Sequence, residues 1–144
     1  MLSSRRSRRG SDPVSRLGAV SLLVRDHDEA LAFYVGKLGF EPVEDADMGG
    51  GKRWVTVRPK GGETVLLLAR AATEGQRARI GDQAGGRVWL FLETDDFARD
   101  HAAFTAAGVR FREAPRHESY GRVAVFEDLY GNAWDLIQPA RTGD

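Results

Sequence analysis

Hydrophobic and polar positions follow the same succession twice along the chain. Residues 17–24 form a leucine-rich, β-branched run of strand length, and apolar residues then recur at helical spacing as far as Gly39. Three further strands are predicted at 41–44, 52–58 and 63–69. The succession returns as a strand at 87–93, a helix ending at 107, and strands at 109–113, 122–127 and 133–138. The pattern therefore predicts two βαβββ modules.

Both predicted helices carry start and stop signals. Asp26 followed by Glu29 matches a capping box, in which a side-chain oxygen accepts a hydrogen bond from the first helical turn. Thr94 or Asp95 is predicted to cap the second helix. A glycine then ends each helix at an equivalent place, because glycine adopts the left-handed conformation at little cost. These glycines are Gly39 and Gly108.

The first strand of each module is apolar on both faces. This predicts a helix on one side of each sheet and an enclosed cavity or a second sheet on the other. Alternation assigns Ala19, Ser21 and Leu23 to the face away from the helix in module one. The corresponding residues of module two are Trp89, Phe91 and Glu93. The predicted fold class is α+β, with two modules forming a cup-shaped, partly open eight-stranded sheet and helices outside.

The hairpin of module one predicts which residues of its later strands lie opposite each other. A four-residue loop at 59–62 pairs Trp54 with Leu67 and Thr56 with Val65. Trp54 and Thr56 then face the same side as Ser21. The segment 47–51 is predicted to be a flexible crossing between strands.

The last hairpin contains the most unusual residue, Asp135, a lone acid in an apolar strand. Gly131 and Asn132 suit a corner with positive φ, and a four-residue loop at 128–131 pairs Ala124 with Asp135. The same register sets Arg122 diagonally opposite Asp135. The pair could form a structural ion pair or clamp a ligand. Trp134 has the opposite parity and is predicted to be buried packing.

The chain length of 144 residues suits one domain with a proper core. We predict a disordered basic tail at 1–16 and a domain at 17–139, followed by a short tail at 140–144. The domain divides into module one at 17–70, a linker at 71–86 and module two at 87–139. No cysteine is present, which excludes disulfides and zinc–thiolate sites and is typical of a reducing cytoplasm.

Charge argues against nucleic acid as the main partner. The segment 1–16 holds five arginines and one aspartate, so the totals of 21 basic and 21 acidic residues leave 16 basic and 20 acidic residues from residue 17 onward. A body with excess acid does not attract a polyanion, although the tail could. The twin arginines of the tail are not followed by the apolar stretch of an export signal. No stretch is long and apolar enough to span a membrane.

Three features together resemble a known family. The strand-to-helix segment Val24-Arg25-Asp26 leads into Ala32-Phe33-Tyr34 and Leu38-Gly39-Phe40, and the βαβββ order repeats. The stretch Asp128-Leu129-Tyr130-Gly131-Asn132-Ala133-Trp134-Asp135-Leu136 is similar to a D-P-x-G-N-x-x-E-L motif. Residues 17–139 therefore resemble the vicinal oxygen chelate superfamily. That superfamily includes glyoxalase I, bleomycin-resistance and fosfomycin-resistance proteins, and extradiol dioxygenases.

The resemblance implies where a metal would bind, but most residues at those positions cannot bind one. In metal-using relatives, the first and last strands of each module supply the donors. Carried over residue by residue, these positions hold Ala19, Leu67, Trp89 and Asp135. Only Asp135 can bind a cation, whereas a divalent metal wants three or more protein donors. We therefore expect no cofactor, and a relocated metal on Asp135 and Glu93, with His117 as a further donor, is the alternative.

The remaining histidines are assigned structural roles. His27 is predicted to be an exposed residue of the first helical turn. His101 lies between Phe97 and Phe104 on the second helix and is predicted to pack there. The predicted ligand contacts, on the inner faces and in the loops, are Ser21, Trp54, Thr56, Trp89, Phe91, Glu93, His117, Tyr120, Arg122 and Asp135.

Three functions are open at this stage. The leading hypothesis is a metal-independent protein that sequesters or senses an aromatic or amphipathic small molecule, with polar anchors and aromatic walls. The second is a metal-dependent enzyme of the glyoxalase, thiol-transferase or dioxygenase type. The third is a dimeric scaffold whose cup is filled by Leu67 and Trp89. Homodimers are implied by the family resemblance.

Overall fold

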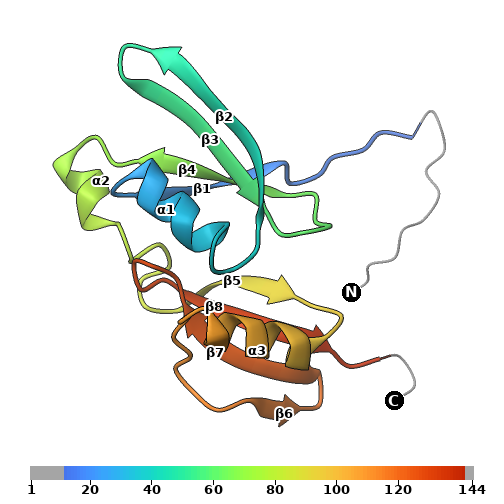
Figure 1. Cartoon of the computed structure of the whole chain (residues 1–144). Coiled ribbons are helices and arrows are strands. Elements are labelled where there is room, and N and C mark those ends of the chain that lie inside the picture. The colour runs from blue at the N-terminus through green and yellow to red at the C-terminus, as the bar shows by residue number, and fades with distance from the viewer. Residues whose placement is uncertain (1–11, 142–144) are drawn as a thin grey trace.

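The computed structural model describes residues 12–141 and contains two successive βαβββ modules (Figure 1). Most of the predicted basic tail lies outside the described residues. The elements of module one are β1 (Ala19–Val24), α1 (His27–Tyr34), β2 (Glu41–Gly49), β3 (Lys52–Arg58) and β4 (Val65–Arg70). After α2 (Glu74–Ala78), module two consists of β5 (Val88–Glu93), α3 (Phe97–Ala106), β6 (Arg116–Glu118), β7 (Gly121–Glu127) and β8 (Ala133–Pro139).

The strands form two four-stranded sheets with equivalent orders. The first sheet has the order β1-β4-β3-β2 and the second the order β5-β8-β7-β6. In each sheet the first strand lies parallel to the last strand of its module, and the remaining pairs are antiparallel. The predicted α+β class with two βαβββ modules is confirmed.

Helix α1 begins where the capping-box pattern predicts. The carboxylate of Asp26 accepts a hydrogen bond of 2.9 Å from the backbone N–H of Glu29. The backbone of Asp26 is extended, as a cap requires, and the helix runs to Tyr34. The next residue of the turn, His27, is only 8% exposed, so the prediction of an exposed histidine is wrong.

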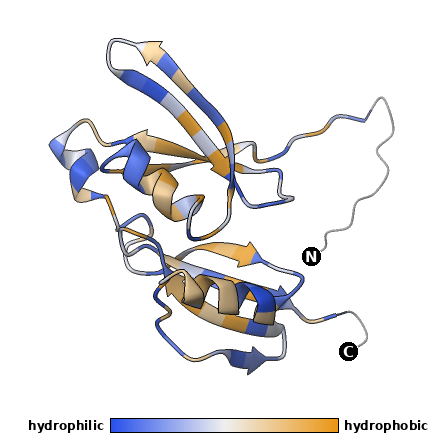
Figure 2. Cartoon of the chain, in the orientation of Figure 1, coloured by the Kyte–Doolittle hydropathy of each residue, from blue (hydrophilic) through white to orange (hydrophobic). Residues whose placement is uncertain are grey.

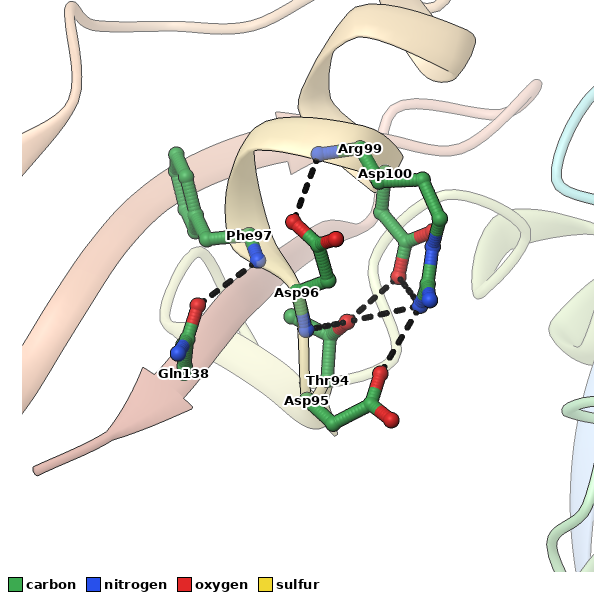
Figure 3. A network of polar contacts seen from close by, with 7 residues as sticks. All are labelled: Thr94, Asp95, Asp96, Phe97, Arg99, Asp100 and Gln138. Carbon is green, nitrogen blue, oxygen red and sulfur yellow. Dashed lines mark hydrogen bonds and ion pairs between the residues drawn. The ribbon is translucent and has the colours of Figure 1, made fainter. Parts of the chain in front are cut away.

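Helix α3 is capped by Asp96 rather than by Thr94 or Asp95 (Figure 3). The Asp96 carboxylate accepts a hydrogen bond from the backbone N–H of Arg99 at 3.0 Å. Thr94, two residues before the cap, supports it, because its hydroxyl accepts a hydrogen bond from the Asp96 N–H and donates one to Asp100. The predicted start was therefore early by one or two residues, and the polar cluster at 94–96 offered three competing caps.

One buried cluster joins the helix faces of both sheets. Trp134 of β8 is at its centre, with its ring centroid 6.0 Å from those of Tyr34 and Phe40 in module one and 5.9 Å from that of Phe126 in module two. Trp134 is 3% exposed, which confirms its predicted packing role. Figure 2 shows the matching pattern, with β5 hydrophobic along its length and α2 hydrophilic.

The glycine–asparagine corner of the last hairpin ties the modules together. Gly131 has φ of 93°, as predicted, whereas no residue other than glycine among those described has positive φ. Asn132 instead donates to the Asp128 carboxylate from its backbone and side-chain nitrogens, both at 2.9 Å. The same carboxylate accepts from the hydroxyl of Tyr34 on α1 at 2.6 Å. The motif therefore links the β7–β8 turn to the first helix.

Two strands differ in extent from their predictions. The sixth strand is β6 at Arg116–Glu118, inside a predicted loop, whereas the predicted strand 109–113 contributes only an isolated bridge between Phe111 and Phe126. Strand β2 continues to Gly49 because it pairs with β3 beyond the core, where apolar patterning gives no signal.

Candidate functional site

Each sheet has a helix face and an opposite face, here called its open face, and we locate the predicted ligand contacts on these faces. In β8, Trp134 and Leu136 belong to the core on the helix side, so the alternating Asp135 lies on the open face of the second sheet. Its strand neighbours are Phe91 on β5 and Val125 on β7. Phe91 is 63% exposed, so this face presents an aromatic ring beside a carboxylate.

Asp135 is a buried carboxylate with an unused acceptor. The residue is 9% exposed, and its Oδ1 has no hydrogen-bond partner among the described residues. Burial raises the pKa of Asp135, Arg116 opposes this effect by its positive charge, and Glu113 adds to it. Arg116 is shared, because it also forms ion pairs with Glu113 at 3.0 Å and Glu118 at 2.6 Å. Asp135 can accept a hydrogen bond or bind a cationic group at modest further desolvation cost.

The predicted pairing of Asp135 with Arg122 is wrong. Glu127 pairs with Ala133 rather than Asn132, so the register differs by one residue from the prediction. A slip of one residue moves a side chain to the other face. Arg122 therefore lies on the helix side, where its guanidinium carbon is 4.7 Å from the ring centroid of Phe97. The turn contains one more residue than predicted, because the backbone N–H of Asp128 donates a hydrogen bond to the carbonyl oxygen of Asn132.

Arg116 and Glu113 are the charged neighbours of Asp135 that the sequence did not indicate. Arg116 pairs with Val123 across β6 and β7, on the same face as Asp135. The stretch 114–121 was predicted to be a loop, so no face could be assigned to Arg116. An arginine directly after a proline in a polar segment carries no signal for a strand.

The open face of the first sheet carries a second polar and aromatic group. Thr56 is opposite Leu67, and Leu67 is beside Ser21 of β1. Pairing of Thr56 with Leu67 replaces the predicted pair of Trp54 with Leu67. A register shift of two residues leaves each side chain on the same side of the sheet. Ser21, Trp54 and Thr56 therefore remain on the predicted side.

Glu44 of β2 completes this group and was not predicted. Its Oε1 accepts a hydrogen bond from the Trp54 indole nitrogen at 2.9 Å and a longer one from the Thr56 hydroxyl at 3.4 Å. Trp54 is 40% exposed, whereas Thr56 is fully buried. The pairing of β2 with β3 shifts between Pro42 and Glu44 and places Glu44 opposite Thr56. Its carboxylate fixes the orientation of an accessible indole.

Trp89 does not lie on the open face. The pairing of β5 with β8 shifts between Val88 and Leu90, so Trp89 occupies an irregularity in the strand. Its ring packs edge-on against Trp134, with centroids 5.6 Å apart, at the margin of the core. The prediction of Trp89 as an inner-face residue is therefore wrong, because a bulge changes the alternation that the sequence pattern assumes.

The remaining candidates do not meet at one point. His117 is opposite Arg122 across β6 and β7, and thus on the helix side, away from Asp135. Glu93 is exposed at the end of β5, on the open face. Tyr120, in the turn before β7, is 54% exposed and hydrogen bonds with the Arg116 side chain. Residues 12–141 contain no group of three His, Cys, Asp or Glu side chains that could hold a metal.

The strand pairs at the family's metal positions supply few donors. These positions hold Ala19, Leu67, Trp89 and Asp135, and the strand pairing places Ser21 beside Leu67 and Phe91 beside Asp135. One carboxylate and one hydroxyl among these side chains do not match the three or more strong donors of a divalent metal site. The residues present therefore do not fit the metal of metal-using relatives.

His101 has the packing role predicted for it. Its ring stacks on Phe97 with a centroid distance of 5.4 Å and lies 4.3 Å from the centroid of Phe111. These contacts place it against the helix side of the second sheet and separate it from the open faces.

Comparison with known proteins shows the family. The family model of the Glyoxalase/Bleomycin resistance protein/Dioxygenase superfamily matches residues 16–136. An uncharacterized protein of Shewanella frigidimarina is 54% identical over 121 residues, which are 83% of this chain and 90% of that protein. The chain belongs to the Glyoxalase/Bleomycin resistance protein/Dioxygenase superfamily.

Solved structures share the fold over nearly the whole domain. The crystal structure of UcmS2 has 32% identity and a TM-score of 0.75, and covers 87% of this chain and 98% of its own. TnmS3, described as an antibiotic binding protein from Streptomyces sp. CB03234, has 33% identity and a TM-score of 0.72 and covers 88% and 98%. Within residues 12–141, no helix has the length and apolar character needed to cross a membrane.

Proposed function

We propose that this protein binds a small aromatic or amphipathic molecule on the open faces of its sheets, without a metal, and so sequesters or senses that molecule in the cytoplasm. The observation that carries this proposal is the pair of Asp135 and Phe91. A nine-tenths buried carboxylate with an unused oxygen lies beside an aromatic ring that is mostly exposed. A polar anchor next to an apolar wall is the usual composition of a small-molecule site.

Likeness to a binding protein supports the same function. TnmS3 is described as binding an antibiotic, and one third of its aligned residues are identical to those of this chain. The donor set argues further for a metal-independent mode, since Leu67 and Phe91 occupy strand positions next to Ser21 and Asp135. The scaffold hypothesis loses one support, because Trp89 packs into the core instead of filling an inner face.

A homodimer is part of the proposal. Each open face is a separate four-stranded surface with an exposed aromatic residue, Trp54 on the first sheet and Phe91 on the second. Each ring leaves apolar surface in water, and a ligand or partner that covers it gains the free energy of removing that surface from water. A second copy that covers both faces would enclose a ligand between them.

Titration with N-phenyl-1-naphthylamine, a neutral aromatic amine whose fluorescence rises in apolar surroundings, tests the binding function. We expect saturable binding by the full-length protein and a loss of affinity of about tenfold in Phe91→Ala, because a central aromatic contact is removed. Leu129→Ala is the matched control. Leu129 is 41% exposed in the β7–β8 turn, away from the open-face strands, and its removal should leave affinity unchanged.

Equal affinity of Phe91→Ala and Leu129→Ala would contradict a site on the second open face. Absence of saturable binding to the unmodified protein would contradict the binding function itself for this ligand class. Thermal midpoints of both variants, measured alongside, separate a lost contact from a lost fold.

A further inference from the structure

The two middle strands of the first sheet separate halfway along their length. Strand β3 pairs with β4 only at Thr56 with Leu67 and Val57 with Leu66, although β4 continues to Arg70. The outer half of β3 remains paired with β2 alone, so the hairpin segment 45–54, here called the arm, projects away from the sheet (Figure 1). The gap contains a hollow of about 570 Å³ between the arm and residues 70–77. This volume suits a drug-sized molecule.

One wall of this hollow is apolar and flat. Trp54 and Met48 line it and are 40% and 62% exposed. The indole nitrogen of Trp54 donates to Glu44, so the orientation of the ring is fixed before any ligand arrives. A fixed indole provides a stacking surface at low entropic cost.

The other lining residues are predominantly basic, and none of them is acidic. The basic side chains are His27, Lys52, Arg53, Arg70 and Arg77. Arg53 is neutralised by ion pairs with Asp28 at 2.9 Å and Asp45 at 2.8 Å, both outside the lining. Lys52, Arg70 and Arg77 form no ion pair with any other residue in the range 12–141.

Unpaired cations around an uncharged wall define the chemistry of the ligand. The body of the chain has more acidic than basic residues, so a hollow with three unpaired cations is an exception to its surface. Two of the three are arginines, whose planar guanidinium groups hydrogen bond carboxylates and sulfonates in pairs. The positive potential of such a cluster attracts anions.

We propose that the arm hollow binds a planar aromatic compound that carries an acidic group. The aromatic body lies against Trp54 and Met48, and the acidic group is held by Arg70 and Arg77 on the opposite wall. This inference rests on the proposed function, because it names the ligand class that the protein selects. It also rests on the proposed homodimer, in which a ligand is enclosed between the face that carries Trp54 and the face that carries Phe91.

A matched pair of probes isolates the acidic group. 8-Anilinonaphthalene-1-sulfonate and N-phenyl-1-naphthylamine share the same aromatic body, and only the first carries a sulfonate. For the full-length protein we expect tighter binding of the sulfonate, by about tenfold, which corresponds to one charge-assisted hydrogen-bonded contact. The double variant Arg70→Gln/Arg77→Gln should lose this preference and keep its affinity for the neutral amine.

Two further variants serve as controls. Arg110→Gln removes an exposed arginine in module two and should leave the preference for the sulfonate unchanged. Trp54→Ala should weaken both probes alike, because it removes the shared aromatic contact. All substituted arginines are exposed, so the arginine variants should retain the thermal midpoint of the unmodified protein.

Equal affinities of the unmodified protein for the two probes would overturn the inference. So would a preference for the sulfonate that persists in Arg70→Gln/Arg77→Gln. If the neutral amine still binds and is weakened by Phe91→Ala in either case, the proposed binding function stands while the arm hollow is excluded. Failure of both probes to bind would contradict the proposed function as well.

Discussion

Equivalent hairpins in the two modules are held together very differently. Strands β7 and β8 pair through seven residue pairs, whereas β3 and β4 pair through two. The outer strands differ in length in the opposite sense. Module one has the longer outer strand, β2 at Glu41–Gly49, and module two the shorter one, β6 at Arg116–Glu118. The same topology therefore produces a closed, buried hairpin in module two and a separated arm with a hollow in module one.

The turns of the two hairpins differ in their hydrogen bonding. In the β7–β8 turn, the Asp128 carboxylate accepts hydrogen bonds from Tyr130 and twice from Asn132, and also from Tyr34 of the first helix. The β3–β4 turn has one internal backbone hydrogen bond, from Gly62 to Pro59. Both hairpins are paired beside their turns, and β3 and β4 separate at the end away from the turn, where β3 pairs with β2 alone.

The largest expected effect is a difference in stability between variants of the two tryptophans in these hairpins. Trp134→Ala removes the ring at the centre of the shared core and should lower the free energy of unfolding by about 3–5 kcal/mol. Trp54→Ala removes a ring that is 40% exposed and should cost about 1 kcal/mol. Urea unfolding of both variants measures the contrast. Similar losses would show that module one depends on its arm as much as module two depends on its core.

A smaller effect is expected at the turns themselves. Asp128→Ala leaves the buried Tyr34 hydroxyl and the Asn132 amide without their acceptor and should cost about 2–4 kcal/mol. Pro59→Ala in the equivalent turn keeps its backbone hydrogen bond and should cost less than about 1 kcal/mol. Chemical unfolding compares the two. A loss in Pro59→Ala as large as that in Asp128→Ala would contradict the role assigned to the aspartate.

The smallest expected effect is a difference in pH dependence between two aspartates. Burial raises the pKa of Asp135, so the folded state binds its proton more tightly than the unfolded state. The stability from this group is complete below about pH 4, the ordinary range of aspartate, and is lost as the pH rises through the raised value. Asp135→Asn should therefore gain stability relative to the unmodified protein between about pH 4 and neutrality.

Asp45 in the arm provides the opposite case. Its hydrogen bonds with Arg53 lower its pKa, so its contribution is present above the ordinary pKa and is lost as the pH falls. Asp45→Asn should lose stability relative to the unmodified protein as the pH rises toward neutrality. Unfolding curves of both variants across this range check the signs. Parallel pH profiles would rule out different protonation behaviour of the two carboxyl groups.

Much of the fold follows from local patterns in the sequence. Capping by Asp26, the glycine corner at Gly131 and the alternation in β1 all depend on neighbouring residues and are seen in the structure. The register of the last hairpin could not be obtained in the same way. It depends on the bonds of Asn132 to Asp128, and the resulting shift of one residue moved Arg122 to the other face.

The open faces were predicted only where alternation is regular. Ser21, Thr56 and Trp54 lie on the predicted side because a register shift of two residues preserves it. Trp89 does not, because the strand pairing is irregular at that residue. Glu44 was missed because the pairing of β2 with β3 is irregular between Pro42 and Glu44, and Arg116 was missed because β6 begins outside the apolar pattern.

Metal-independent binding is tested most directly by one titration under two conditions. N-phenyl-1-naphthylamine is titrated into full-length protein dialysed against EDTA, and then into the same protein supplied with Mn²⁺, Ni²⁺ or Zn²⁺. We predict the same dissociation constant in every case, because Asp135 is the only strong metal donor among the four strand positions. Binding that appears only after a metal is added, and that disappears in Asp135→Ala, would contradict this account.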